Sequence, residues 1–202
     1  VPVSACAALH GLRDAGQLRQ GQQVLTIGAG GGDGTFAVQL AKAFGAAATG
    51  VCSPAKAELV RTIGADHVID YTRGDFAGGG RRYDLILDIA GNNPLPRLRR
   101  ALAPDGTLII AGGEGGGPLI GGGDRQLRAS LLSPFTRQKL RGLMSAEHAE
   151  DLRDLRELIE AGKVTPAIDR TYALGEAAEA IRRLHAGQAR GKLVITVQEE
   201  DS

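Results

Sequence analysis

A doubly wound α/β fold with a parallel sheet is predicted for this 202-residue chain. Three observations predict it. Apolar runs of strand length alternate with segments of helical periodicity, a glycine-rich turn joins the first run to the first helix, and each crossover between parallel strands must pack a helix back on the sheet. The core rests on aliphatic side chains, because 43% of the residues are apolar and only 3% are aromatic.

The expected elements alternate along the chain. Short apolar runs predict strands over residues 22–29, 47–52, 67–71, 83–91, 105–113 and 140–144. Helical spacing of apolar residues predicts helices over residues 36–44, 59–63, 95–102 and 152–159, and a glycine stands near the end of three of them. Residues 114–123 are rich in glycine and predict a loop.

The turn after the first strand is the strongest functional signal. Residues 28–36 are GAGGGDGTF, with Gly30, Gly31, Gly32 and Gly34 between strand and helix. In a Rossmann-type domain such a turn brings bare backbone up to a pyrophosphate, and the helix N-terminus binds the anion. We therefore predict that it binds a dinucleotide; the alternative is a flexible turn with no ligand. No Gly-Lys-Ser/Thr follows, which disfavours a triphosphate P-loop.

The end of the second strand indicates which dinucleotide. Enzymes that use the unphosphorylated cofactor place an acid there for the ribose hydroxyls. Here the chain runs through Ser53 and Pro54, a good N-cap and a good first helical residue, to Lys56, and no acid is present. A lysine in a first helical turn opposes the helix dipole, which a cofactor 2′-phosphate would offset. This pattern predicts NADP(H); a solvated surface lysine is the alternative.

The last forty residues predict a tail of strand (166–174), helix (176–185) and strand (191–197). These elements are an awkward addition to a doubly wound sheet. We therefore divide the chain into a dinucleotide-binding Rossmann-type domain, residues 1–165, and a C-terminal tail, residues 166–202. An unpaired apolar strand edge is an association site, so a homodimer through the C-terminal strands is expected.

Composition excludes several classes of function. The 24 basic and 23 acidic residues nearly balance and aromatic residues are few, so no nucleic-acid partner is expected. Two cysteines and four scattered histidines offer neither a four-thiolate zinc site nor a disulfide framework. No apolar run is long enough to span a membrane and no signal peptide is recognisable. We expect a cytoplasmic protein that acts on a small-molecule substrate.

Several segments together resemble a known family. They are SACAALHGL, GQQVLTIGAGGGDGTFAVQLAKAFGA, KAELVRTIGADHVIDY, YDLILDIAGN and GTLIIAGGEGG. They are similar to the cofactor domain of medium-chain dehydrogenases/reductases, above all the zinc-independent quinone oxidoreductase branch. The resemblance implies hydride transfer from NADPH to a quinone, enone or similar carbonyl. It also implies cofactor contacts at the following residues: the Ala-x-Gly-x-x-Gly pattern of Ala29, Gly31 and Gly34, the 2′-phosphate residues Ser53, Lys56 and Tyr71, and the strand ends at Asp88 and Gly112.

The sequence departs from the family pattern in three ways. Relatives carry a GroES-like catalytic domain before the cofactor domain, and the tail strands return to it; no such domain precedes Val1 here, and the lack of an initiator methionine indicates a trimmed chain or fragment. Relatives commonly have Thr at the position of Ala7 and Val at that of Asp33, both beside the nicotinamide. Redox activity of this chain alone is therefore in doubt.

Asp33 leaves several interpretations open. It is either an outward-facing acid that the helix dipole favours, or a carboxylate in the nicotinamide cleft. In the second case it weakens dinucleotide binding, or it serves as general acid or base in non-redox chemistry on a small molecule. A catalytically idle nucleotide-binding module is a further alternative. A methyltransferase is a distant one, since that class usually has an acid at the second strand end.

Overall fold

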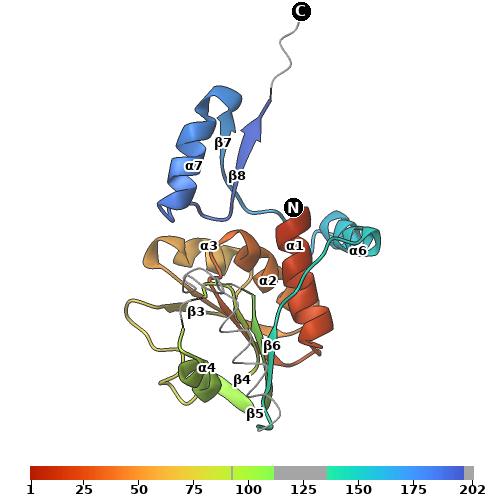
Figure 1. Cartoon of the computed structure of the whole chain (residues 1–202), viewed down its shortest axis with the longest axis vertical. Helices are drawn as coiled ribbons and strands as arrows, with labels where there is room; N and C mark the ends of the chain where they lie inside the picture. Colours follow the sequence, from red (N-terminus) through yellow and green to blue (C-terminus); the bar gives the residue numbers. More distant parts are fainter. Residues whose placement is uncertain (92, 112–135, 198–202) are drawn as a thin grey trace, which may run out of the picture.

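A parallel sheet of six strands forms the centre of the computed structural model, which describes residues 1–91, 93–111 and 136–197 (Figure 1). The spatial order is β3-β2-β1-β4-β5-β6 and every pairing is parallel. The strands are β1 (Gln23–Ile27), β2 (Ala47–Cys52), β3 (His67–Asp70), β4 (Tyr83–Asp88), β5 (Leu102–Ile110) and β6 (Lys139–Gly142). The order reverses between β1 and β4, so the predicted Rossmann-type doubly wound sheet is confirmed.

Helices cover both faces of this sheet. They are α1 (Pro2–Leu9), continued by the π-helical η1 (His10–Ala15), then α2 (Gly32–Ala43), the short 3₁₀ turn η2 (Pro54–Lys56), α3 (Ala57–Thr62), α4 (Leu95–Ala101) and α6 (Ala149–Glu160). One buried cluster joins α1, α2, α3 and α6 to one face of the sheet, and a second joins α4 to the other. In the described part of the chain, no helix is long and apolar enough to cross a bilayer.

The central strands are apolar on both faces because both faces are covered. In β1, Val24 belongs to the first cluster and the next residue, Leu25, to the second. Side chains of a strand alternate between the two faces of its sheet, so a strand buried on both sides has a continuous apolar run. This explains why short apolar runs without alternation identified the strands correctly.

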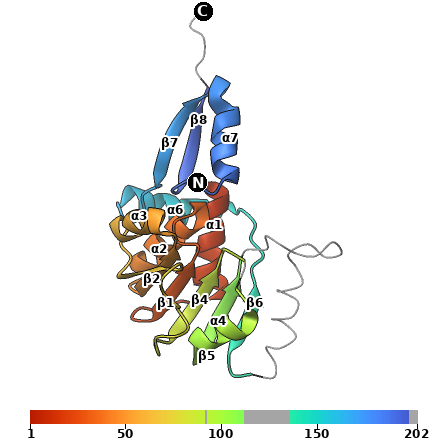
Figure 2. The same ribbon diagram turned by 90° about the vertical axis from the view of Figure 1, so that its left-hand side faces the viewer.

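The described strands of the C-terminal tail form a sheet of their own. The tail consists of β7 (Ile168–Ala173), the 3₁₀ turn η4 (Leu174–Glu176), α7 (Ala177–His185) and β8 (Lys192–Thr196), and β7 pairs with β8 in a parallel two-stranded sheet. Figures 1 and 2 show these tail elements beyond one end of the main sheet, on the side where α1 begins. The N–H of Gly191 donates to the carbonyl oxygen of Gly30 at 3.2 Å, so the tail meets the glycine-rich turn. A domain boundary at residue 165 stays a prediction.

Several element bounds differ from the sequence-based expectation. Sequence patterns missed α1, because its small side chains (among them Ser4, Ala5 and Cys6) give little apolar contrast although all three are buried. The fifth strand begins at Leu102 rather than residue 105. Leu102 pairs with Tyr83 and Thr107 pairs with Leu85, so the turn-like residues between Leu102 and Thr107 lie where the register of the two strands shifts. The sixth covers residues 139–142 rather than 140–144.

Candidate functional site

A groove of about 750 Å³ lies where β1, β2 and β4 end. It therefore lies at the point where the strand order reverses, which is where doubly wound sheets bind their ligands. Its lining comes from the glycine-rich turn, the end of β2, the segment after β4 and the tail: Ile27, Gly28, Gly30, Gly31, Val51, Cys52, Ser53, Lys56, Tyr71, Phe76, Ile89, Ala90, Asn93, Arg97 and Gly187. Among these described residues there is no carboxylate.

The glycine-rich turn is shaped by backbone contacts that other residues would prevent. Gly28 has φ +91°, in the left-handed region that favours glycine. The N–H groups of Gly28 and Ala29 both donate to the carbonyl oxygen of Val51 at 3.0 Å, which ties the turn to β2. A Cβ on Gly34 would overlap the carbonyl oxygen of Gly28, so the first turn of α2 packs directly on the strand end. This brings the N-terminus of α2 to the groove.

The first turn of α2 can receive an anion. Its N-cap residue, Gly31, lines the groove and offers no side chain to cap the helix. The unbonded N–H groups of a helix N-terminus and the helix dipole favour negative charge at that point. A phosphate-bearing ligand in the groove would satisfy them.

Lys56 lies on the glycine-rich turn itself. A Cβ on Gly30 would come within 2.6 Å of the Lys56 Cβ, so only a glycine leaves room for the aliphatic part of this lysine. Burial lowers the pKa of Lys56 from its ordinary value, and the nearby Arg190 lowers it further, against the opposing effect of Cys52 and Asp169. A half-buried ammonium of this kind gains from a bound anion. Ser53 and Tyr71 line the same end of the groove.

Ser53 is the N-cap residue of a 3₁₀ turn rather than of an α-helix. The α-helix starts only at Ala57, and the Ser53 side chain makes no capping hydrogen bond. Ser53 and Pro54 therefore occupy the predicted N-cap and first helical positions, but the helix they begin is a 3₁₀ turn that leads into α3. The turn ends at Lys56, whose side chain lies against Gly30. The Ser53 hydroxyl remains available to a ligand in the groove.

Lys192 is a residue that sequence reasoning missed. It is the first residue of β8, and its ammonium donates to the hydroxyl of Ser4. A Cβ on Gly32 would lie 2.5 Å from the Lys192 Nζ, so this lysine covers the glycine-rich turn from the tail side. Burial lowers the pKa of Lys192, while the charge of Asp33 opposes that shift. Two partly desolvated lysines therefore flank the turn, and no local pattern links residue 192 to residue 32.

Asp33 lies in the first turn of α2, half-exposed, and is not among the residues that line the groove. A carboxylate at this position is favourable to the helix dipole. Its charge acts on Lys192 across the turn. Asp33 thus reduces the positive potential that Lys192 gives this side of the turn.

The other residues predicted to contact a cofactor are placed as follows. Ala29, in the glycine-rich turn, and Asp88, the last residue of β4, are fully buried and do not line the groove. Gly32 and Gly34 lie in the first turn of α2. Gly112 falls outside the described residues.

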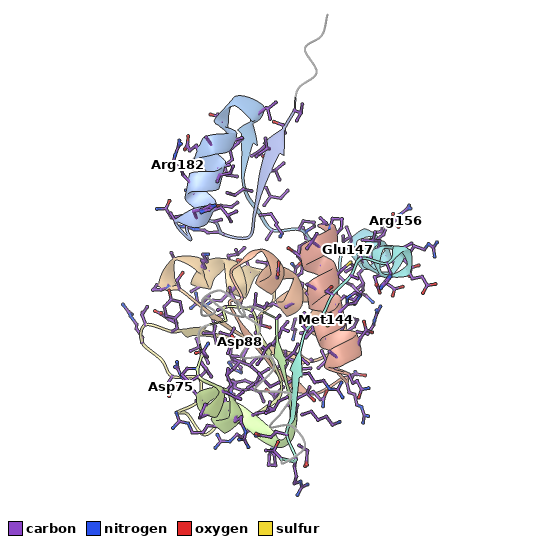
Figure 3. The ribbon with its side chains drawn as sticks, viewed as in Figure 1. Asp75, Asp88, Met144, Glu147, Arg156 and Arg182 are labelled. Carbon is purple, nitrogen blue, oxygen red and sulfur yellow. The ribbon has the colours of Figure 1, made fainter. Side chains whose placement is uncertain are left out.

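Sequence patterns also did not reveal one side wall of the groove, to which Arg97 belongs. The Arg97 guanidinium lies 4.4 Å from the centroid of the Phe76 ring, within the range of a cation–π contact. It is held by Asp75 at 2.9 Å and by the Asn93 side chain at 3.2 Å. These residues come from the loop before β4 and from the start of α4, and Figure 3 labels Asp75 there. Arg97 thus adds a second cation, after Lys56, to the lining of the groove.

Comparison with known proteins identifies the family. The family model described as "Zinc-binding dehydrogenase" matches residues 63–195, which is more than half of the chain. This chain belongs to the zinc-binding dehydrogenase family. The predicted resemblance to the cofactor domain of medium-chain dehydrogenases/reductases is confirmed.

Relatives match nearly the whole chain. NAD(P)H oxidoreductase RTN4IP1, mitochondrial, of Mus musculus is 32% identical over 217 residues, covering 98% of this chain and 54% of the relative. Quinone-oxidoreductase QR1, chloroplastic, of Triphysaria versicolor is 31% identical over 86% of this chain and 52% of its own length. The structure of the quinone oxidoreductase from Coxiella burnetii aligns with a TM-score of 0.83 and 27% identity, over 98% of this chain and 59% of its own. The chain thus spans about half the length of the curated relatives it matches.

The family description names zinc, but the described residues of this chain offer no donor set that fits it. Within residues 1–91, 93–111 and 136–197, no group of three or more His, Cys, Asp or Glu side chains could hold a metal ion. The two cysteines, Cys6 and Cys52, are both buried.

Proposed function

We propose that the groove binds NADPH and that the chain is the cofactor domain of an oxidoreductase that reduces a quinone, enone or related carbonyl by hydride transfer. The names of the relatives, an NAD(P)H oxidoreductase and quinone oxidoreductases, support a nicotinamide cofactor. The observation that carries the choice of NADPH is the composition of the groove, where Lys56 follows β2 and the described lining residues include no carboxylate. A ribose 2′-phosphate needs a cation at that place, whereas free ribose hydroxyls need an acid.

Each part of the groove then has a role toward the cofactor. Ser53, Lys56 and Tyr71 would hold the 2′-phosphate, because they line the end of the groove that β2 reaches. The N-terminus of α2 would receive the pyrophosphate, with Lys192 as the nearest cation from the tail. When bound, the cofactor supplies the hydride, and the protein positions it. Because Asp33 lies outside the groove, no observation favours it as a general acid or base.

Removing the Lys56 ammonium is expected to abolish the preference for NADPH. We expect Lys56→Ala to weaken NADPH binding by roughly tenfold to a hundredfold, the effect of losing one charge-assisted phosphate contact, and to leave NADH binding nearly unchanged. Calorimetric titration of both cofactors measures this. Lys163→Ala, which removes an exposed lysine near the end of α6, is the matched control. Equal affinity of the native chain for both cofactors would contradict the assignment.

We also propose that the chain forms a homodimer through its C-terminal strands. The β7–β8 sheet has only two strands, so each strand has one edge without a partner in this sheet. Several large apolar side chains of the tail are more than half exposed: Ile168, Leu174, Ile181, Leu184 and Val197. Light scattering across micromolar concentrations is expected to give twice the monomer mass, and a monomer throughout would refute this proposal.

A further inference from the structure

Away from the groove, a second cavity of about 660 Å³ lies between η1 and the segment that joins β6 to α6. Figure 3 shows Met144 and Glu147 on that segment, beside α1. The cavity contains a serine, a histidine and an aspartate in hydrogen-bond contact: Ser145, His10 and Asp151. The nucleotide site described above uses none of them. They come from two parts of the chain about 135 residues apart, so no local sequence motif could have predicted that they meet.

The hydrogen bonds of His10 fix its tautomer. Its Nε2 lies 2.8 Å from a carboxylate oxygen of Asp151, and its Nδ1 lies 2.9 Å from the hydroxyl oxygen of Ser145. Hydrogen bonds from Arg13 and His10 lower the pKa of Asp151, so this carboxylate is ionised and can only accept. The Nε2 atom therefore carries the proton, and Nδ1 accepts from the serine hydroxyl. This is the connectivity of an activated serine, with the two ring nitrogens exchanged relative to the serine proteases.

The exposure of the three side chains matches these three roles. Ser145 is exposed to the cavity, His10 is 8% exposed and Asp151 is 5% exposed. A nucleophile must meet its substrate, whereas the base and the carboxylate that orients it act best away from water. The histidine also begins the π-helical segment η1, a rare conformation that is frequent at functional sites.

Acidic side chains surround the cluster of Ser145, His10 and Asp151. Arg13 pairs with three carboxylates, those of Asp14, Asp151 and Asp154. One guanidinium against three carboxylates leaves two negative charges uncompensated. The Asp14 carboxylate is also 3.9 Å from the Nε2 of His10.

Other titratable groups face this cluster. His148 has its ring centroid 6.3 Å from that of His10, and Glu150 lines the same cavity. On the α1 side lies Cys6, whose thiol pKa is raised by burial and by the charges of Asp151 and Glu147. The carboxylate of Glu150 adds negative charge near His10. The Cys6 thiol is neutral and therefore does not compensate this charge.

The N-terminus of α6 can stabilise the charge that such a nucleophile generates. This 12-residue helix follows His148, which makes no side-chain cap, and the first residues of the helix line the cavity. Its free N–H groups, with the helix dipole, attract the negative charge that develops on a carbonyl oxygen under attack. Leu143 and Met144, which is 93% exposed, give the cavity an apolar side that suits a short acyl chain.

We propose that Ser145, His10 and Asp151 form a second active site, which hydrolyses carboxylic esters of short acyl chains. The Ser145 oxygen bonds to the ester carbonyl carbon while its proton passes to Nδ1 of His10. The bond from that carbon to the alcohol oxygen breaks, and His10 returns the proton to the departing alcohol. Water then attacks the acyl-serine and gives a proton to His10, which passes it to Ser145 as the acid leaves. Asp151 keeps the His10 tautomer throughout.

The test uses this 202-residue chain with 4-nitrophenyl acetate and butyrate as substrates. We expect release of nitrophenol that Ser145→Ala and His10→Gln each reduce at least tenfold. Thr62→Ala and His185→Gln, which alter an exposed hydroxyl and an exposed imidazole on α3 and α7, should leave the rate unchanged. Ser145→Ala should also leave the affinity for NADPH unchanged, which separates this site from the proposed nucleotide site.

A fluorophosphonate probe identifies the nucleophile directly. Displacement of fluoride by an activated serine forms an oxygen–phosphorus bond, and mass spectrometry of the digested chain should place this adduct on Ser145. Labelling should be lost in His10→Gln, because an exposed serine without its base does not react. Esterase rates equal in the native chain and Ser145→Ala, or a label on other residues with none on Ser145, would overturn the proposal. Because Ser145 is exposed, its alanine variant is expected to fold, which circular dichroism checks.

Discussion

Replacing Gly34 by alanine is expected to destabilise the chain by about 3 kcal/mol, the upper range for a forced contact in a packed core. The added Cβ would overlap the carbonyl oxygen of Gly28 and lie 2.7 Å from the Ala29 Cα. Both are backbone atoms, so no rotamer change can relieve the contact and α2 must move away from β1. For a chain of this length, the midpoint of thermal unfolding should fall by roughly 10 °C.

The same change should weaken NADPH binding more than tenfold, because displacement of α2 moves its N-terminus out of the groove. Gly79→Ala is the matched control. No heavy atom lies within 4 Å of the position of a Cβ at Gly79, and its φ is not in the left-handed region. Denaturant unfolding and calorimetry measure the two effects. If Gly34→Ala unfolds at the same denaturant concentration as Gly79→Ala, the close packing of α2 on the turn is wrong.

Sequence patterns predicted the sheet well, since its strands obey local rules. Strands such as β1 and β4 are buried on both faces and therefore consist of short, continuous apolar runs. The glycine-rich turn was equally visible, because the left-handed φ of Gly28 and the close approach at Gly34 admit essentially one residue type. The absence of an acid after Val51 could also be seen in the sequence, because the residues that follow a strand are known once the strand itself has been located.

What the sequence could not predict depends on contacts between distant segments. Lys192 is 160 residues from Gly32, yet its ammonium lies over that glycine. Arg97 faces the groove only because Phe76 and Asp75 hold its guanidinium. The bonding of His10 to Ser145 and Asp151 requires η1 to pack beside the start of α6. None of these pairings has a spacing that local patterns can detect.

Lys192 and Asp33 are expected to act on the cofactor with opposite signs. Lys192→Ala should weaken NADPH binding by about thirtyfold, because it removes about 2 kcal/mol of a charge-assisted phosphate contact. Asp33→Asn should tighten binding by about fivefold, since it removes repulsion of about 1 kcal/mol between a carboxylate and the cofactor phosphates. The asparagine variant should lose a few tenths of a kcal/mol of stability, because the first turn of α2 loses a favourable charge.

The double variant shows whether the two charges act on each other. The charge of Asp33 favours the protonated form of Lys192. In return, the positive charge of Lys192 shields a bound ligand from the negative charge of Asp33. Asp33→Asn should therefore tighten NADPH binding more in the Lys192→Ala background than in the native chain, with a coupling free energy of about 1 kcal/mol. Lys42→Ala, which removes a lysine near the other end of α2, is the control for net charge. If Asp33→Asn changes the affinity in neither background, Asp33 is only an outward-facing acid that stabilises α2, and the carboxylate in the glycine-rich turn has no influence on the cofactor.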